Sequence, residues 1–481
     1  MKPALHDEPL HDEPLHAHSY LCESQALAQF DLLATDAASA NASLQTLAAL
    51  VSKLADPVKF LSEAANTFSR NGHHLSAELS AVLLIKYNPG RLDSYRLFSH
   101  VLRRAGHQDE AEVLFSFCMP AALVKKYFSS NTLVLSSSND GEGVSKESLF
   151  SARKHPAKPP LQMHSNKLAV FSNPFLHEQN AYVTTLENGR LWFDGYLNTV
   201  VWDKAGAVVT DLCQGNPQIV ADRCCDLTAL TLTGKVCLLG NRNPDNYYHW
   251  MNDIVPKFGL LDLSDTDVAS IDYFVLNSSN TTFQRETLGL LGIDKSKVLS
   301  SNNSPYLLCD ELIVPKYGSN TLGMGQGKWA AEYLVNVFGT QSQTSKSRKL
   351  YISRGNRGAR SIVNEDDVVA FLEKNGFETI HPEKYSVQEQ ARLFCEAKVV
   401  LGPHGAGLSN IAFCKSGTKI VELYCNKIAP TFWNTCQLHG FAHYAHQFSK
   451  GNPDSVFSEA ESELFVCVKE LGTLLEFIDS R

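Results

Sequence analysis

The chain has 481 residues, of which 44% are hydrophobic, so it is long enough for two or three domains with complete cores. Its net charge of −8 and pI near 6.1 give no overall basic field, which argues against nucleic acid as a partner. Twelve scattered cysteines without a CxxC pair indicate reduced thiols, and no signal-like or long apolar run is present, so we expect a cytoplasmic protein without an integral membrane segment.

The first 128 residues divide into a polar tail and a helical region. Residues 1–20 hold the repeat LHDEPLHDEPLH, whose composition predicts a disordered tail, although its histidines could also bind a metal ion. Residues 21–128 have Ala and Leu at three- and four-residue spacing and predict a helical domain. The stretch Leu75–Phe115 is TPR-like, that is, it resembles a tetratricopeptide hairpin that would bind a protein partner. Only one repeat is visible, which favours a bundle that extends the rest of the protein.

The middle of the chain changes from a polar to a β-rich composition. Residues 129–165 are rich in Ser, Asn, Gly, Lys and Pro, which predicts an exposed linker. Residues 166–340 alternate short apolar stretches with turns and helical patterns, so we expect a second domain there. Its clearest candidate strands are Lys235–Leu239, Ile271–Leu276 and Glu311–Val314.

A polar pair lies in the aromatic stretch Asn246–Pro256, where a helix is expected to begin. Trp250 and Ile254 fall on its buried face, and His249 and Asp253, four residues apart, share the neighbouring face. An imidazole beside a carboxylate is what general-base catalysis requires, whereas an ion pair on the surface is the alternative. The sequence has no third ligand at a fixed spacing from this pair, so it does not indicate a zinc site.

Three arginines follow the predicted strand Lys349–Ser353. Arg354, Arg357 and Arg360 place three guanidinium groups within seven residues of an otherwise acidic protein. Arginine matches phosphate oxygens bidentately, so this loop predicts a diphosphate site, with a solvated basic loop as the alternative.

The stretch Lys398–Tyr424 predicts a strand, a glycine-rich turn, a short helix and a second strand. The turn His404-Gly405-Ala406-Gly407 suits close approach of a phosphate or a sugar hydroxyl to a helix N-terminus, although the glycines could serve only close packing. Asn410 stands where the dinucleotide-binding fingerprint has its third glycine, which argues against a nicotinamide-dependent oxidoreductase.

Residues 341–481 as a whole alternate strands and helices. This order predicts a parallel, doubly wound sheet with its ligand at the carboxyl ends of the strands, where Arg354 and His404 would emerge. Glu422 ends a strand on the same edge, where a carboxylate can accept ribose hydroxyls or cap a neighbouring helix.

Three stretches together resemble glycosyltransferase family 61. They are NYYHWMNDIVPKFGLL, LYISRGNRGARSIVNEDDVVAFLEKNGFETI and EQARLFCEAKVVLGPHGAGLSNIAFCKSGTKIVELY. The resemblance covers residues 167–481 and implies a GT-B fold, in which two Rossmann-like domains face a cleft. Residues 166–340 would form the acceptor-side domain and residues 341–481 the nucleotide-sugar-binding domain.

The resemblance also implies an activity. The enzyme would be an inverting, metal-independent hexosyl- or pentosyltransferase that needs no cofactor beyond its nucleotide-sugar donor, expected to be UDP-linked. Asp253, or else His249, would deprotonate the acceptor. The donor-binding residues carried over from the family motifs are Arg354 and Arg357 for the phosphates, His404, Gly405, Ala406 and Gly407 for the donor, and Glu422 for the ribose.

Because we expect no membrane anchor, the chain resembles a bacterial-type member of that family. Such a member would act in cell-surface polysaccharide synthesis on a glycan or protein acceptor. The helical domain would then recruit a protein partner. The alternative is a catalytically silent nucleotide-binding scaffold that acts through its helical domain.

Overall fold

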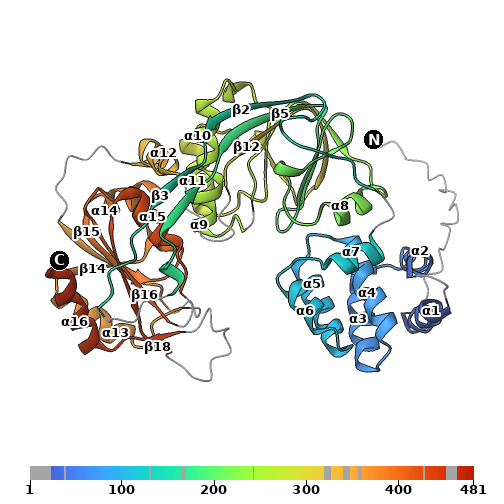
Figure 1. Ribbon diagram of the computed structural model, residues 1–481, viewed down its shortest axis with the longest axis horizontal. Coiled ribbons are helices and arrows are strands. Elements are labelled where there is room, and N and C mark those ends of the chain that lie inside the picture. The colour runs from blue at the N-terminus through green and yellow to red at the C-terminus, as the bar shows by residue number, and fades with distance from the viewer. Residues whose placement is uncertain are drawn as a thin grey trace, which may run out of the picture. The chain divides into compact units, whose positions relative to one another are not determined.

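Figure 1 shows the computed structural model of the chain. It forms two compact units, Met1–Thr132 with Gln218–Asp226 and Leu133–Pro217 with Leu227–Arg481. The predicted tail, residues 1–20, and the predicted phosphate ligand Arg357 lie outside the described residues. The residues that the structure describes are 23–36, 40–128, 132–163, 169–241, 243–318, 327–339, 347–355, 360–425, 428–450 and 463–481.

The first unit is helical, as the leucine and alanine spacing predicts. At the start of α3, the Asp56 carboxylate accepts from the Lys59 N–H, and Pro57 fills the first helical position, where no N–H is needed. The helices predicted within Leu75–Phe115 are confirmed, while the TPR-like interpretation stays a prediction. The helices are α1 (Glu23–Asp36), α2 (Ala40–Val51), α3 (Pro57–Arg70), α4 (His74–Tyr87), α5 (Leu92–Arg104), α6 (Gln108–Phe115) and α7 (Ala121–Tyr127).

One helix from later in the chain adds to this unit. α8 (Pro217–Cys224) carries Asp222, whose carboxylate lies 2.8 Å from Lys86 Nζ on α4. The Arg223 guanidinium lies 5.7 Å from the centroid of the Tyr87 ring. The boundaries drawn from the sequence assign this helix to residues 166–340, whereas these contacts attach it to the helical unit.

The second unit begins with a ten-stranded mixed sheet. β9 pairs in parallel with β10 and β12, whereas β12 pairs in antiparallel fashion with β5 and β6. The expected Rossmann-like pattern therefore does not extend over this sheet. Its strands are β1 (Leu135–Ser136), β2 (Val144–Phe150), β5 (Ala181–Glu187), β6 (Arg190–Phe193), β7 (Thr199–Trp202), β8 (Val208–Val209), β9 (Leu230–Leu238), β10 (Tyr273–Leu276), β11 (Val298–Ser300) and β12 (Tyr306–Lys316).

The prediction of a linker at residues 129–165 is wrong for much of the part that the structure describes. β1 and β2 belong to the mixed sheet, and β3 (Arg153–Pro156) pairs with β4 (Phe175–Glu178). Among the strands that the structure describes, β2 pairs only with β5, and its polar sequence VSKESLF suits such an edge. A polar strand at the edge of a sheet therefore has the same composition as a linker, which explains the wrong prediction.

The second sheet has five strands in the order β14-β13-β15-β16-β17, and all neighbours are parallel. α13 and α16 pack on one face, with Leu372 and Leu471 in one core with Tyr351 and Leu401. α14 covers the other face (Figure 1). The doubly wound arrangement is confirmed. Its strands and helices are β13 (Arg348–Ile352), β14 (Phe377–Ile380), β15 (Ala397–Pro403), β16 (Lys419–Tyr424), β17 (Ala442–Gln447), α13 (Glu365–Lys374), α14 (Val387–Cys395) and α16 (Val468–Asp479).

A helix in three parts joins the two sheets through one core. α9 (Tyr247–His249) is followed by the π-helical turn η3 (Trp250–Ile254) and by α10 (Pro256–Leu263). In the π turn the Val255 N–H donates to the carbonyl of Trp250, five residues earlier, at 3.0 Å. Trp250 and Phe258 are buried in the same core as Leu350 and Val400 of the second sheet, as their spacing predicts.

The remaining elements are short or connect these layers. They are α11 (Thr282–Leu290), α12 (Lys328–Phe338), α15 (Thr431–His439), β18 (Ser449–Lys450), β19 (Leu464–Phe465) and the 3-10 segments η1 (Ala169–Phe171), η2 (Thr210–Leu212), η4 (Val268–Ser270), η5 (Lys295–Lys297), η6 (Pro382–Lys384) and η7 (Ala406–Phe413).

Candidate functional site

A cavity of about 480 Å³ lies where β13 and β15 end, and we call it the switch-point cavity. The chain leaves β13 toward β14 on one side of the sheet, while β15 lies on the other, and ligands of α/β proteins bind where the order reverses in this way. Both halves of the second unit line it, including Tyr247, Phe283, Glu286, Arg354, Tyr385, Gln390, Gly405, Ala406 and Gly407.

Arg354 and the glycine turn meet in this cavity, as predicted from the sequence. The Arg354 Nη1 donates to the His404 carbonyl oxygen at 3.5 Å. η7 begins directly after Gly405 without a side-chain cap, and Ala406 and Gly407 of its first turn line the cavity together with Arg354. A guanidinium group beside free N–H groups is an arrangement that suits phosphate oxygens.

Glu422 is placed differently from its predicted role. Its side chain is fully buried, Oε1 lies 2.5 Å from His404 Nδ1, and Oε2 lies 2.9 Å from His443 Nε2. Burial alone would raise the pKa of the Glu422 carboxyl, but the hydrogen bonds and charges of the two imidazoles outweigh it and lower the pKa to about 2. Both oxygens are thus engaged inside the protein, so Glu422 orients His404 and has no oxygen exposed for a ribose.

Asn410 explains the missing third glycine of the turn. It is fully buried, its Oδ1 accepts from the Tyr247 hydroxyl at 2.8 Å, and its Nδ2 donates to Gln390 Oε1 at 2.7 Å. A glycine here would leave Tyr247 and Gln390 without this bridge. The residue that argues against a dinucleotide fingerprint therefore links the two halves of the cavity wall.

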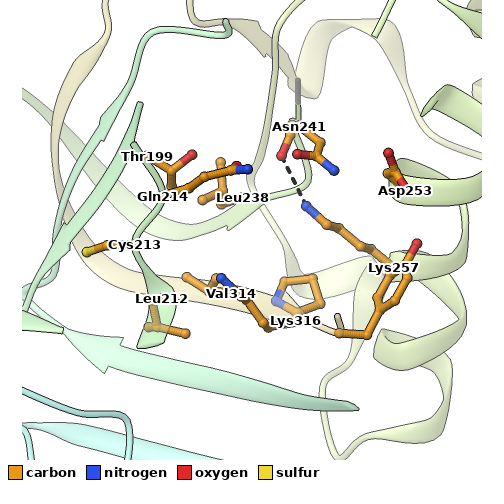
Figure 2. A pocket seen from close by; sticks show the side chains of 13 residues that line it. Thr199, Leu212, Cys213, Gln214, Leu238, Asn241, Asp253, Lys257, Val314 and Lys316 are labelled. Carbon is orange, nitrogen blue, oxygen red and sulfur yellow. Dashed lines mark hydrogen bonds between the residues drawn. The ribbon is translucent and has the colours of Figure 1, made fainter. Parts of the chain in front are cut away.

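A second cavity of about 280 Å³ lies in the first sheet, and we call it the lysine cavity (Figure 2). Its lining includes Asp253, Lys257 and Lys316, together with the polar side chains of Asn241 and Gln214. Tyr247 and Asp253 belong to the same short helix but line different cavities. Six residues of helix rise by about 9 Å, so these two residues lie roughly that far apart along the helix axis.

His249 and Asp253 form the pair that their spacing predicts. His249 Nδ1 lies 2.7 Å from Asp253 Oδ2, and the Asp253 side chain is only 5% exposed, so the pair is not a surface ion pair. The other oxygen, Oδ1, is buried and has no hydrogen-bond donor among the described residues. A buried carboxylate oxygen without a donor is costly, and the hydroxyl of a bound molecule would satisfy it.

The sequence pattern did not predict that Lys257 and Lys316 line a cavity. Lys257 is partly buried, and its Nζ donates to the carbonyls of Leu239 at 2.8 Å and Gly240 at 3.0 Å. Burial and, to a smaller extent, the nearby charge of Lys316 together lower the pKa of Lys257 to about 8, against the opposing charge of Asp253. Lysines in amphipathic patterns are usually solvated, so their sequence context holds no signal for burial.

Metal ligands are not gathered in this region. Within the described ranges, no group of three or more His, Cys, Asp and Glu side chains is arranged to hold a metal ion. The eleven cysteines that the structure describes are free thiols. In the same ranges, no helix has both the length and the apolar character needed to cross a membrane.

A cavity at the switch point of a parallel sheet, with an arginine and a helix N-terminus on its wall, is typical of nucleotide-binding α/β proteins. Residues 247–421 match the family described as Glycosyltransferase 61, which supports a glycosyltransferase and implies donor and acceptor substrates. The matched range contains His249, Asp253, Arg354 and the glycine turn, and it ends one residue before Glu422. No curated protein matches the chain.

Proposed function

We propose that the protein is an inverting, metal-independent glycosyltransferase. The observation that carries the proposal is the buried Asp253 carboxylate, which His249 holds through one oxygen while the other oxygen has no donor in the described chain. It lies on the helix whose first residue, Tyr247, lines the switch-point cavity. The family match over residues 247–421 supports the same activity.

The donor is a nucleotide sugar in the switch-point cavity. Arg354 binds the diphosphate together with the N–H groups at the start of η7, and we assign Arg357 the same role from its place in the sequence. His404, Gly405, Ala406 and Gly407 line the sugar-phosphate part of the donor. A UDP-linked hexose or pentose and the lack of any further cofactor remain predictions.

In the proposed transfer of the sugar, Asp253 accepts the proton of the acceptor hydroxyl. As the acceptor oxygen attacks the anomeric carbon from the face opposite the diphosphate, its proton passes to Asp253 Oδ1 and the bond from carbon to phosphate oxygen breaks. The bond pair leaves with the diphosphate, whose charge Arg354 stabilises. His249 holds Oδ2 and so keeps Oδ1 turned to the acceptor.

We interpret the two sheets as the halves of a GT-B fold, with a first half that departs from a parallel pattern. The acceptor is a glycan or a protein, and a bacterial-type role in cell-surface polysaccharide synthesis fits the sequence resemblance. The cytoplasmic location and a protein partner at the helical unit stay predictions. The alternative of a silent scaffold gains nothing from the family match and leaves the Asp253 oxygen without a use.

Thermal stabilisation tests the donor, because a ligand that binds the folded state raises the melting temperature. Nucleoside diphosphates, their sugars and NAD(P) are compared on the wild type and on Arg354→Ala. A shift with one diphosphate and its sugar, lost in Arg354→Ala, together with release of that diphosphate in the presence of acceptors, is expected. A shift with NAD(P) alone, or with none of the panel, contradicts the proposal.

A further inference from the structure

The lining of the lysine cavity carries more positive than negative charge. Lys257 and Lys316 both line a space of about 280 Å³, in which Asp253 is the carboxylate of the lining. Asp253 already accepts from His249 through Oδ2. Two ammonium groups in one small cavity repel each other, and this repulsion lowers the pKa of Lys257 further than burial does alone.

Lys257 keeps a donor for a ligand. An ammonium group has three N–H donors, and Lys257 uses two of them on the carbonyls of Leu239 and Gly240. These two bonds fix the position of Nζ at the wall of the cavity, whose lining side chains are drawn in Figure 2. The third donor belongs to a positively charged group that lines the cavity, so an anion is its best partner.

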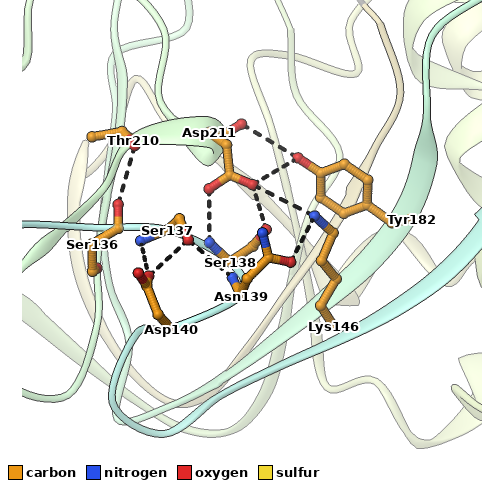
Figure 3. Close-up of polar contacts among 9 residues, drawn as sticks. All are labelled: Ser136, Ser137, Ser138, Asn139, Asp140, Lys146, Tyr182, Thr210 and Asp211. Carbon is orange, nitrogen blue, oxygen red and sulfur yellow. Dashed lines mark hydrogen bonds and ion pairs between the residues drawn. The ribbon is translucent and has the colours of Figure 1, made fainter. Parts of the chain in front are cut away.

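Lys316 is partly buried, and no hydrogen bond or ion pair to its Nζ is present among the described residues. Burial lowers the pKa of Lys316, and the charge of the Asp211 carboxylate opposes this effect. Asp211 is already engaged by the Ser138 N–H at 2.8 Å, by the Ser138 and Tyr182 hydroxyls, and by Lys146 Nζ at 3.8 Å (Figure 3). Lys316 is therefore not neutralised by the wall of the cavity.

We infer that the lysine cavity binds the acceptor through an anionic sugar residue, whose carboxylate or phosphate group lies between Lys257 and Lys316 while a hydroxyl reaches Asp253 Oδ1. The inference rests on the proposed function and adds the chemical class of the acceptor. A volume of 280 Å³ equals that of about nine waters, which is enough for a single monosaccharide with its substituent. Gln214 and Asn241 line the same space and offer amides to the remaining hydroxyls.

Titration calorimetry with four small probes tests this inference. Methyl glucoside is the neutral sugar, glucuronic acid supplies a carboxylate, glucose 1-phosphate supplies a phosphate, and inorganic phosphate supplies the anion alone. One or both anionic sugars are expected to bind the wild type at least about tenfold more tightly than methyl glucoside, because a charged hydrogen bond is gained. The stronger of the two identifies the source of the anion.

Lys316→Met is the main variant, because no contact of its Nζ in the described chain supports the fold. It should bring the anionic and neutral sugars within about twofold of each other, while Lys316→Arg retains most of the preference. Lys235→Met is the matched control, since Lys235 lies on β9 beside Glu311, at 3.7 Å, and outside the cavity. Equal losses in Lys316→Met and Lys235→Met would overturn the inference.

Lys257→Met provides a second test with its own control. Lys297 also donates to two carbonyls, those of Ala269 at 3.2 Å and Ile271 at 2.7 Å, but does not line the cavity. Both substitutions should lower the melting temperature, whereas only Lys257→Met should abolish the preference for an anionic sugar. Loss of the preference in both variants would contradict the inference.

The same preparations separate this inference from the proposed function. If a nucleoside diphosphate stabilises the wild type and Lys316→Met alike, and the wild type binds neutral and anionic sugars equally, the inference fails while the glycosyltransferase stands. If no nucleotide binds but the anionic preference is present, the proposed function fails instead. Inorganic phosphate binding as tightly as glucose 1-phosphate would overturn the assignment of a sugar.

Discussion

The guanidinium group of Arg354 lies directly against the α-carbon of Gly405. A Cβ added to Gly405 would collide with Arg354 Nη1, and that nitrogen donates to the carbonyl of the adjacent His404. The φ of Gly405 is 172°, an extended value that any residue adopts, so the glycine is needed for close approach and not for its backbone conformation. This contact holds the arginine at the wall of the switch-point cavity.

Gly405→Ala should therefore displace Arg354 and weaken binding of the nucleoside diphosphate. Loss of a charged hydrogen bond of about 1.5–3 kcal/mol corresponds to roughly 10–100-fold weaker binding, measured by calorimetry. Gly289→Ala on α11 is the control, since a Cβ there meets no atom within 4 Å. Unchanged affinity in Gly405→Ala would show that Arg354 does not contact the diphosphate.

Asp253→Asn should remove the base and keep the shape of the site. We expect kcat to fall by about 10²–10⁴-fold, the usual contribution of general-base catalysis, with the stabilisation by the nucleotide retained. Asp262→Asn, at an exposed position of the following helix α10, should leave kcat unchanged. A comparable loss of kcat in both variants would remove Asp253 from the mechanism.

Glu422 should make stability depend on pH in the acid range. Because folding lowers the pKa of its carboxyl from 4.5 to about 2, the stabilisation is complete above pH 4.5 and is lost as the pH falls through about 2. In urea unfolding, the wild type should exceed Glu422→Gln by a few kcal/mol at pH 7, on the order of the pKa shift. The difference should shrink as the pH falls below 4.5, and a constant difference would contradict the ion pairs with His404 and His443.

Tyr247→Phe should loosen the link between the two halves of the switch-point cavity. The change removes the hydroxyl that donates to Asn410 Oδ1 and leaves that buried oxygen without this donor, at a cost of about 1–3 kcal/mol. The melting temperature should fall by several degrees, and nucleotide binding should weaken with it. Tyr196→Phe, at a tyrosine that is 48% exposed, is the control and should change neither.

The second sheet could be predicted because its signals are local. The alternation of strands and helices predicted for residues 341–481 is present, and short-range contacts such as the capping box of Ser386 and Glu389 start its helices. His249 and Asp253 could be paired because a helical spacing of four brings side chains together. Each of these predictions depends on residues close in sequence.

The mixed first sheet could not be predicted in the same way. β12 pairs with β5, β6 and β9, and these partners are separated from it by about 70 residues or more. A pattern of apolar residues identifies a strand without giving its neighbours or its direction. The surroundings of Lys257 and of Glu422 could not be predicted either, since the carbonyls and imidazoles that contact them come from other elements of the fold.

The π turn at Trp250–Ile254 has a consequence for the joint use of the two cavities. Such a turn amounts to one inserted residue in a regular helix, and each residue of a helix turns the chain by about 100°. Deleting one residue there would rotate Tyr247 by that angle relative to α10, away from Asn410, if Asp253 kept its place beside Lys257. The angular offset between the helix residues that line the switch-point cavity and those that line the lysine cavity is thus set by a single residue of chain length.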